Sequence, residues 1–273
     1  MTIKLKKIAP LAILFQLLSL FLFSQVAQAS DTTFDRIQKE GVLIVGMSGE
    51  QPPFNFVSRL DKVIGYDMDL AATIGKSMGV KVRIELMPFS TLMKALQKRE
   101  IDVIISGFAS TEARSKELTF VGPYALSGKS LVVTKERLKE ITAATGFNDK
   151  SVHLMALEHS TSKSLAEERL SKAKLTTIKH YEDAILALRA GEADALVADL
   201  AICELAVIRD STKRLTTLQK PLAVEEISIA INKDEPLLEA RLTEELRALT
   251  QSGEINDIRD KWFNSPGWLE LLP

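Results

Sequence analysis

The sequence predicts an α/β protein with two lobes, each built on a mostly parallel sheet. Short apolar, β-branched runs alternate with amphipathic segments between residues 41 and 114, and again from residue 151 onward. Strands separated by helical segments are typical of parallel sheets covered by helices. The polar, helix-prone stretch 135–150 separates the two series, and 273 residues suffice for two medium-sized units. We therefore expect two α/β lobes.

The first series starts with a buried strand and continues through a hairpin and two helices. Gln51 and Phe54 flank two prolines, which fix the backbone and cannot continue a strand. Asp67 and Asp69 fall in the first turn of a helix, where the helix dipole stabilises carboxylates by roughly 0.3–1 kcal/mol each. The expected elements are the strand 41–46, the hairpin 55–57 with 63–64, the helix 65–78, the strand 81–86, the helix from 90 and the strand 103–105.

The second series repeats the alternation and adds two C-terminal helices. In the first of them, Leu238, Leu242 and Leu246 share one face. Ligands of parallel α/β sheets bind beyond the carboxyl ends of the strands, so residues that follow strands are the first candidates for a site. The expected strands are 152–157, 175–178, 193–199 and 227–231, and the expected helices are 162–172, 181–190, 200–209, 236–251 and 255–263.

Two strand ends carry charged residues. After the apolar strand 103–105, small residues lead into a helix start at Thr111, which predicts free backbone N–H groups able to hold an anion. Arg114 adds a planar fork that can bind a carboxylate with two hydrogen bonds. Asp199 ends a strand of the second series and supplies an anion. A zwitterion held between the lobes would fit this pairing; the alternative is an ordinary strand–turn–helix whose Arg114 points to solvent.

Residues 1–29 are predicted to be a cleaved signal peptide. Three lysines precede the apolar run 11–23, and Ala27 and Ala29 provide a small-x-small cleavage site. An uncleaved membrane anchor is the alternative, but the apolar run is short for a membrane span. We therefore expect a periplasmic protein that is secreted through this signal.

Charge and cysteine content exclude several classes. The net charge is −1, or about −4 once the signal lysines are lost, which argues against nucleic acid or an anionic membrane as partner. Cys203 is the single cysteine, so no internal disulfide forms. Together with His153, His159 and His180 it gives no metal-ligand spacing, and we expect no metal or cofactor. No nucleophile–base or paired-carboxylate spacing supports catalysis, so we expect a protein that is not an enzyme.

Several segments resemble the family 3 solute-binding proteins, the periplasmic receptors for polar amino acids that feed ABC importers. The resemblance covers nearly the whole mature chain. It implies a bilobal type II fold with a two-strand hinge, in which residues 30–127 and 225–273 form lobe one and residues 128–224 form lobe two. The segments that carry it are Gly65–Met78, Pro53-Phe54, residues 102–114 ending in Thr111-x-x-Arg114, Phe120-x-x-Pro123-Tyr124, Gly191-x-x-Asp194-Ala195 with Asp199, and Lys261-Trp262-Phe263.

The resemblance also implies a monomer that closes its lobes on a small-molecule ligand, an amino acid or related small carboxylate, and delivers it to an inner-membrane ABC permease. Arg114 would bind the ligand α-carboxylate first, and closure would add Thr161 and Asp199. Asp199 would accept the α-ammonium. The other expected ligand-site residues are Ala109 and Thr161 through their N–H groups, Gly107 or Ser106 through a carbonyl, Phe89 as a ring against the ligand side chain, and Ser160, Gln51 and Phe54.

The chain departs from the family pattern at four places. Ala109 stands where the family usually has Ser or Thr, and Gln51 where an aromatic residue is common. Ser48 replaces an acid that binders of cationic amino acids carry, whereas Glu158 could restore that preference or face solvent. Glu158 and His159 also stand where Gly usually precedes the hydroxyl pair. Two alternative functions follow: a dehydratase-like periplasmic enzyme on the same fold, using Glu158 or His159, and a ligand-presenting component of a sensor.

Overall fold

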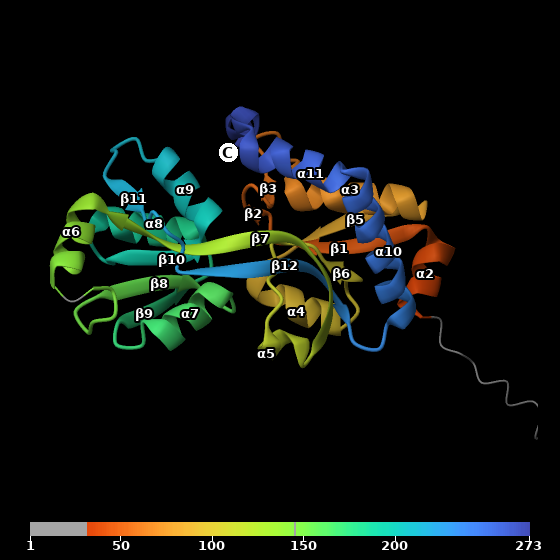
Figure 1. The fold of residues 1–273 in the computed structure, drawn as a ribbon, viewed down its shortest axis with the longest axis horizontal. Coiled ribbons are helices and arrows are strands. Elements are labelled where there is room, and N and C mark those ends of the chain that lie inside the picture. Colours follow the sequence, from red (N-terminus) through yellow and green to blue (C-terminus); the bar gives the residue numbers. More distant parts are fainter. Residues whose placement is uncertain (1–31, 145) are drawn as a thin grey trace, which may run out of the picture.

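The protein consists of two lobes joined by two long strands, as Figure 1 shows. The computed structural model describes residues 32–144 and 146–273; the predicted signal peptide lies outside these residues. The strands are β1 (Val42–Met47), β2 (Glu50–Gln51), β3 (Asn55–Val57), β4 (Val63–Ile64), β5 (Lys81–Leu86), β6 (Val103–Ile104), β7 (Leu118–Thr134), β8 (His153–Leu157), β9 (Lys174–Ile178), β10 (Ala195–Asp199), β11 (Leu215–Thr217) and β12 (Ala223–Asn232).

Helices cover both faces of the strands in each lobe. None of the described helices is both long and apolar enough to cross a bilayer. The helices are α2 (Thr33–Glu40), α3 (Tyr66–Met78), α4 (Phe89–Gln97), α5 (Glu112–Ser115), α6 (Lys135–Ala144), α7 (Thr161–Arg169), α8 (Tyr181–Ala190), α9 (Leu200–Ile208), α10 (Pro236–Ser252) and α11 (Glu254–Arg259), followed by a π-helical turn (Asp260–Asn264) and a 3₁₀ turn (Pro266–Leu271).

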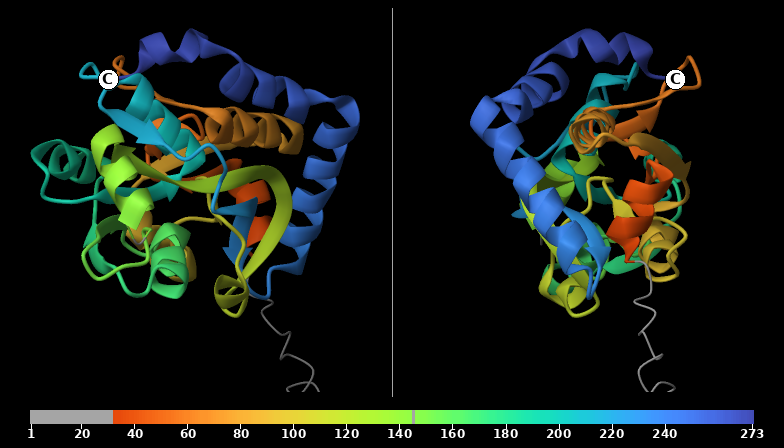
Figure 2. Two further views of the ribbon diagram at one scale, coloured as in Figure 1. Left: turned by 60° about the vertical axis from the view of Figure 1, so that its left-hand side comes forward. Right: turned by 90° about the vertical axis from the view of Figure 1, so that its right-hand side faces the viewer.

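Lobe one contains β1, β5 and β6 with the helices α2–α5, α10 and α11. β1 pairs in parallel with both β5 and β6. Side chains alternate across the strands: Leu43 and Val45 pack towards α3 and α10, whereas Ile44 and Ile104 pack towards α4. Strands buried on both faces explain why the sequence shows continuous apolar runs there. Figure 2 shows the C-terminal helices, in blue, along the outside of this lobe.

Lobe two contains β8–β11 with the helices α6–α9. β8 pairs in parallel with β9 and β10, while β10 pairs antiparallel with β7. Leu196 and Ala198 pack towards α8 and α9, and Ala195 and Val197 pack on the opposite face. All the strands except β2–β4 belong to one sheet that runs through both lobes in the order β5-β1-β6-β12-β7-β10-β8-β9, with β11 on β7. The expected fold of two α/β lobes with a two-strand hinge is confirmed.

The two connecting strands are β7 and β12. They pair antiparallel from Leu118 with Asn232 to Lys129 with Ala223, with one register shift between Ile227 and Ile229. β7 runs without interruption through Gly122, Pro123 and Gly128, because β12 supplies ladder partners along most of its length. The exact residues at which one lobe gives way to the other remain predictions.

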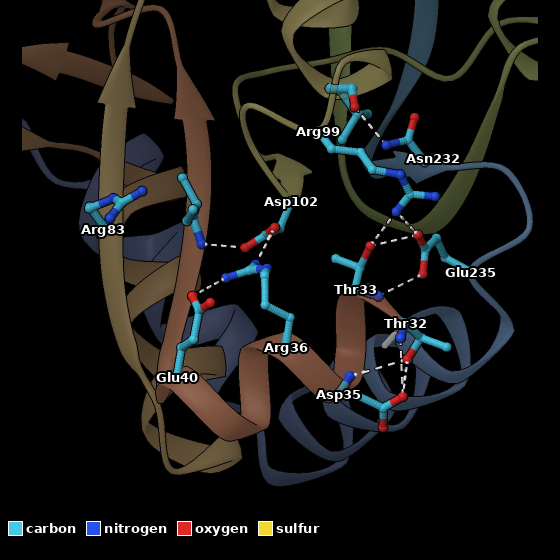
Figure 3. A network of polar contacts seen from close by, with 12 residues as sticks. Thr32, Thr33, Asp35, Arg36, Glu40, Arg83, Arg99, Asp102, Asn232 and Glu235 are labelled. Carbon is cyan, nitrogen blue, oxygen red and sulfur yellow. Dashed lines mark hydrogen bonds and ion pairs between the residues drawn. The ribbon is translucent and has the colours of Figure 1, made fainter. Parts of the chain in front are cut away.

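The N-terminal helix α2 was not expected from the sequence. It is short, and its start is fixed by a capping box between Thr32 and Asp35. Figure 3 shows how ion pairs and hydrogen bonds hold it to the base of lobe one. Arg36 pairs with Asp102, which also accepts the backbone N–H of Ile44, and Glu235 pairs with Arg99.

The end of the chain also departs from the expected single helix 255–263. α11 stops at Arg259 and continues as a π-helical turn. In that turn Lys261 Nζ and Trp262 Nε1 both donate to Asp69, at 2.6 and 2.7 Å. Asp69 therefore anchors the C-terminal segment to α3, in addition to sitting in the first turn of that helix.

Candidate functional site

A cavity of about 550 Å³ opens between the lobes. Its walls come from α5 in lobe one, from α7 in lobe two and from the beginning of β12. Three of its lining residues, Arg114, Ser160 and Thr161, are residues that the sequence assigned to the ligand site. A second cavity, of about 380 Å³, lies between β2 of lobe one and the helices α8 and α9 of lobe two. The space between the lobes is therefore the candidate ligand site.

Arg114 extends from α5 across the boundary between the lobes. Its Nη1 donates to the carbonyl of Ala109 at 2.8 Å, and its Nη2 donates to the carbonyl of His159 in lobe two at 3.0 Å. The guanidinium carbon lies 3.9 Å from the ring centroid of Phe108 and 5.8 Å from that of Phe89. No carboxylate of the residues in the structure lies within ion-pair distance of it. Arg114 is thus a positioned cation whose fixed partners are neutral.

Burial shapes the electrostatics of Arg114. Desolvation lowers the pKa of the guanidinium to about 10, while the more distant carboxylates of Glu225 and Asp199 oppose that change. The side chain stays protonated at neutral pH. A cation that is desolvated without a counter-ion is a favourable partner for a carboxylate, because pairing recovers part of the lost hydration.

The loop before α5 places N–H groups beside this cation. Thr111 caps α5 by accepting the N–H of Arg114 at 3.2 Å. Ala109 forms a bridge with Ile227 in which its neighbours make the hydrogen bonds: Ser110 N–H donates to Glu226 and Ser228 N–H donates to Phe108. The N–H of Ala109 consequently points away from β12 and has no partner within residues 32–144 and 146–273. The sequence analysis assigns this N–H to the ligand site, and that assignment stays a prediction.

Asp67 holds the same loop in place through a hydrogen bond to its backbone. It is fully buried and accepts from Asn55 Nδ2 at 2.7 Å, from Gly107 N at 2.8 Å and from the Tyr124 hydroxyl at 2.8 Å. Burial raises the pKa of the carboxyl group to about 6, although the three hydrogen bonds act in the opposite direction. Gly107 has φ +54°, and a Cβ there would lie 2.7 Å from Gln51 Oε1, so this position requires glycine. From the sequence, Asp67 was expected only to stabilise the start of a helix; its hydrogen bonds to the loop were not predicted.

The carboxylate of Asp199 is held by two neighbouring side chains. Its Oδ1 lies 2.7 Å from Lys129 Nζ and 3.1 Å from the Ser127 hydroxyl. Lys129 Nζ also lies 3.2 Å from Glu225 Oε2, whose second neighbour is the Thr161 hydroxyl at 2.7 Å. We call Lys129, Asp199 and Glu225 the hinge triad, because they lie side by side on β7, β10 and β12. The sequence analysis did not identify this pairing.

Lys129 is protonated and deeply buried. Its residue surface is only 3% exposed. Burial alone would lower the pKa of the ammonium, but the charges and hydrogen bonds of Asp199 and Glu225 raise it above its ordinary value. The two acids of the triad are therefore engaged with an internal cation.

Four other predicted site residues have different surroundings. Phe89 lies beside Arg114 and also packs against the core of lobe two, so it contacts both lobes. Ser106 and Phe54 are buried supports: Ser106 Oγ accepts the N–H of Ser48, and Phe54 packs on Tyr66. Ser160 caps α7 and donates to the carbonyl of Leu157.

Three buried side-chain oxygens have no hydrogen bond of ordinary geometry within the described part of the chain. They are Gln51 Oε1 in lobe one and, in lobe two, Ser162 Oγ and the Tyr181 hydroxyl. Gln51 and Tyr181 interact with each other across the lobe boundary. These two side chains therefore contribute to the contact between the lobes.

Glu158 and His159 are the residues that the enzyme alternative would use as acid or base. His159 is exposed, has φ +56° and contributes its carbonyl to Arg114. Glu158 is half-buried. No cluster of three potential metal ligands occurs among the residues that the structure describes.

The family model of the bacterial extracellular solute-binding proteins, family 3, matches residues 43–265. The chain belongs to this family. A relative is the L-cystine-binding protein TcyJ of Escherichia coli (strain K12), which is 23% identical over 87% of this chain and 88% of its own length.

Solved structures of this family have the same fold. A putative binding component of an ABC transporter from Wolinella succinogenes, complexed with lysine, has a TM-score of 0.77, 27% identity, and coverage of 84% of this chain and 99% of its own. The ancestral amino-acid-binding protein AncCDT-1, described as a precursor of cyclohexadienyl dehydratase, has a TM-score of 0.76, 28% identity, and coverage of 85% and 100%. The type II fold expected from the sequence is thereby confirmed.

Proposed function

We propose that this family 3 protein captures a small solute bearing a carboxylate, an amino acid or a related acid, between its lobes. After export to the periplasm through the predicted signal peptide, it would deliver that solute to the permease of an ABC importer. The relatives are described as binding proteins, which supports capture without chemical change.

The observation that carries the proposal is the state of Arg114. A guanidinium held by two carbonyls and an aromatic ring is fixed in position, so little entropy is lost when it binds. Its planar fork matches a carboxylate with two parallel hydrogen bonds. The free N–H of Ala109 and the first N–H groups of α7 at Thr161 add donors to the same anion.

Closure of the lobes completes this site. Arg114 in lobe one already contacts His159 in lobe two, and Glu50 contacts His180 with Nδ1 2.9 Å from Oε1. A ligand carboxylate that draws on Arg114 and on the N-terminus of α7 makes its full set of contacts only when the lobes meet. Ligand binding then shifts the population towards the closed form, which a permease can recognise.

A thermal-shift screen followed by calorimetry tests the proposal. The purified protein, freed of carried-over ligand by unfolding and refolding, is screened against the twenty amino acids and small carboxylic acids, because a ligand raises the unfolding temperature by mass action. For the strongest hit, Arg114→Ala should weaken binding by roughly a hundredfold, since it removes two charge-assisted hydrogen bonds.

Arg83→Ala is the matched control, because Arg83 is an exposed arginine of lobe one on β5. It should bind like the wild type. The proposal fails if no carboxylate in the screen stabilises the protein, or if Arg114→Ala binds the hit as tightly as the wild type does.

A further inference from the structure

Asp67 is a buried carboxylate whose hydrogen bonds reach three segments of lobe one and its connecting strand. It is completely buried and accepts from the backbone N–H of Gly107, from Asn55 Nδ2 and from the Tyr124 hydroxyl. All three donors are neutral. A carboxylate buried without a cation costs stability, and a cost of this kind is typical of residues that serve function.

The first segment is the loop of residues 106–109, which we call the ligand loop. Gly107 donates to Asp67 Oδ2 at 2.8 Å while it adopts a left-handed conformation with φ +54°. The next residue, Phe108, places its ring centroid 3.9 Å from the guanidinium carbon of Arg114, and the carbonyl of Ala109 accepts from Arg114 Nη1. The bond to Asp67 therefore fixes the backbone from which two partners of Arg114 project.

Asn55 and Tyr124 extend the network to the other two segments. Asn55 Oδ1 accepts the N–H of Gly49 at 2.7 Å, which holds the turn before β2, and Glu50 of β2 contacts lobe two. Tyr124 belongs to the connecting strand β7, in the stretch where its register with β12 shifts. One carboxylate thus joins the ligand loop, an edge of lobe one that meets lobe two, and a connecting strand.

These contacts require the ionised form of Asp67. A carboxylate accepts at both oxygens, whereas a protonated carboxyl or an amide donates at one position and would face another donor there. Burial raises the pKa of Asp67 to about 6, against the effect of its three hydrogen bonds, so the ionised form is lost just below neutral pH.

The titratable groups that interact with Asp67 in the described part of the chain are two phenols. They belong to Tyr66 on the same helix, on which Arg259 of α11 also acts, and to Tyr124 on β7. Burial raises the pKa of both phenols, so they stay neutral at physiological pH. A change of affinity between mildly acidic and neutral pH that depends on this network therefore reports Asp67.

We infer that ionised Asp67 is a positioning residue for ligand capture, which fixes the ligand loop so that Arg114 is aligned to meet a carboxylate. The inference rests on the proposed function, since it assumes a solute whose carboxylate binds Arg114. It deepens that function by assigning a task to a residue that lies outside the cavity lining.

Calorimetry of Asp67→Asn at several pH values tests this role. The probe is the single compound, among the twenty amino acids and small carboxylic acids, that raises the unfolding temperature most. At about pH 8 the variant should bind it roughly tenfold more weakly than the wild type, because the amide N–H faces a donor and displaces the ligand loop. The ratio of the two dissociation constants should fall towards one at about pH 5, where the wild-type carboxyl is also neutral. Groups that both proteins share, such as the pair of Glu50 and His180, cancel in this ratio.

Asp69→Asn is the matched control. Asp69 lies on the same helix, but it accepts from Lys261 and Trp262 of the C-terminal segment. Its variant should bind the probe within about twofold of the wild type at every pH. If Asp67→Asn does not fold, Tyr124→Phe takes its place: the pH at which the affinity falls should rise by roughly half a unit to one unit, because a bond that stabilises the ionised form is missing.

The outcomes separate this inference from the proposed function. Binding by Asp67→Asn within about twofold of the wild type at pH 8 overturns the inference alone. So does a ratio that stays constant down to pH 5, since the loss would then come from altered packing and not from the charge, or an unchanged midpoint in Tyr124→Phe. A wild type that binds no carboxylate, or Arg114→Ala that binds the probe as tightly as the wild type, overturns the proposed function as well.

Discussion

Arg114, which is half-buried, and Lys129, which is buried, are two cations near the lobe boundary with opposite surroundings. Arg114 is held by carbonyl oxygens and a phenyl ring, and no carboxylate in the described part of the chain pairs with it. Lys129 is held by two carboxylates, which a serine and a threonine hydroxyl also contact. The protein thus pairs Lys129 with its own carboxylates and leaves Arg114 without one, which is the difference that the proposed binding of a ligand carboxylate to Arg114 rests on.

The largest expected effect is on the stability of a Lys129→Ala variant. Removal of the ammonium leaves Asp199 and Glu225 buried next to each other without a cation, which should lower the free energy of unfolding by about 3–5 kcal/mol. Urea denaturation followed by circular dichroism measures the change. A loss below about 1 kcal/mol would show that water already reaches the triad and would remove the contrast with Arg114.

Asp67 is a buried carboxylate whose hydrogen-bond donors are neutral, unlike the carboxylates of the hinge triad. The pH dependence of stability that it causes therefore reports the effect of burial without an ion pair. Burial raises its pKa to about 6, above the ordinary carboxyl value, so the folded protein takes up a proton at a higher pH than the unfolded chain does. Its contribution to stability therefore grows as the pH falls from about 7 to 4, by on the order of 1–3 kcal/mol, and is lost as the pH rises through 6.

Denaturation of the wild type and of Asp67→Asn across this pH range checks the sign. The difference in unfolding free energy should shift in favour of the wild type as the pH is lowered, because asparagine does not titrate. A constant difference would mean that the donors from Gly107, Asn55 and Tyr124 offset the cost of burying the charge.

Arg114→Ala should change stability far less than Lys129→Ala does. The variant loses two hydrogen bonds to carbonyls and a cation–π contact, but it also removes a desolvated cation without a counter-ion. We expect the free energy of unfolding to change by no more than about 1 kcal/mol, while binding of the ligand weakens by roughly a hundredfold. Destabilisation as large as that of Lys129→Ala would indicate that Arg114 has a structural task instead.

The smallest effect concerns the exposed contact between Glu50 and His180. The hydrogen bond and charge of Glu50 raise the pKa of His180, so the ion pair is complete below the ordinary histidine value and is lost as the pH rises through the raised one. Fluorescence energy transfer between dyes on the two lobes should report slightly more open molecules at pH 8 than at pH 6. Glu50→Gln should abolish this pH dependence; a dependence that persists would assign it to another group.

The sequence was sufficient for those features that depend on local pattern. The alternation of apolar runs and amphipathic segments predicts the order of strands and helices, and the Thr111 cap places Arg114 at the start of a helix. The position of Asp199 at the end of a strand was predicted in the same way, from the apolar run before it. Each of these depends on neighbours within a few residues along the chain.

The hinge triad was not accessible in the same way. Lys129 and Asp199 are directly opposite in the register of β7 and β10, and Ala223, two residues before Glu225, is opposite Lys129 on β12. These pairings join residues 70 or more positions apart, and the register of strands is set by the folded sheet. The alternating polar residues Ser127 and Lys129 were a signal, but they did not reveal which strands would face them. Asp67 lies in the first turn of α3 as predicted, but its hydrogen bonds were missed for the same reason, since two of its partners, Gly107 and Tyr124, come from distant segments.

The register of β7 against both β10 and β12 also has a kinetic consequence. It holds the three charged side chains of the hinge triad, two carboxylates around one ammonium, on strands that are paired with one another. If these pairings persist when the walls of the cleft separate, a solute meets the same three charges before and after closure. Stopped-flow fluorescence should then show an initial, concentration-dependent binding phase that precedes the closing of the lobes.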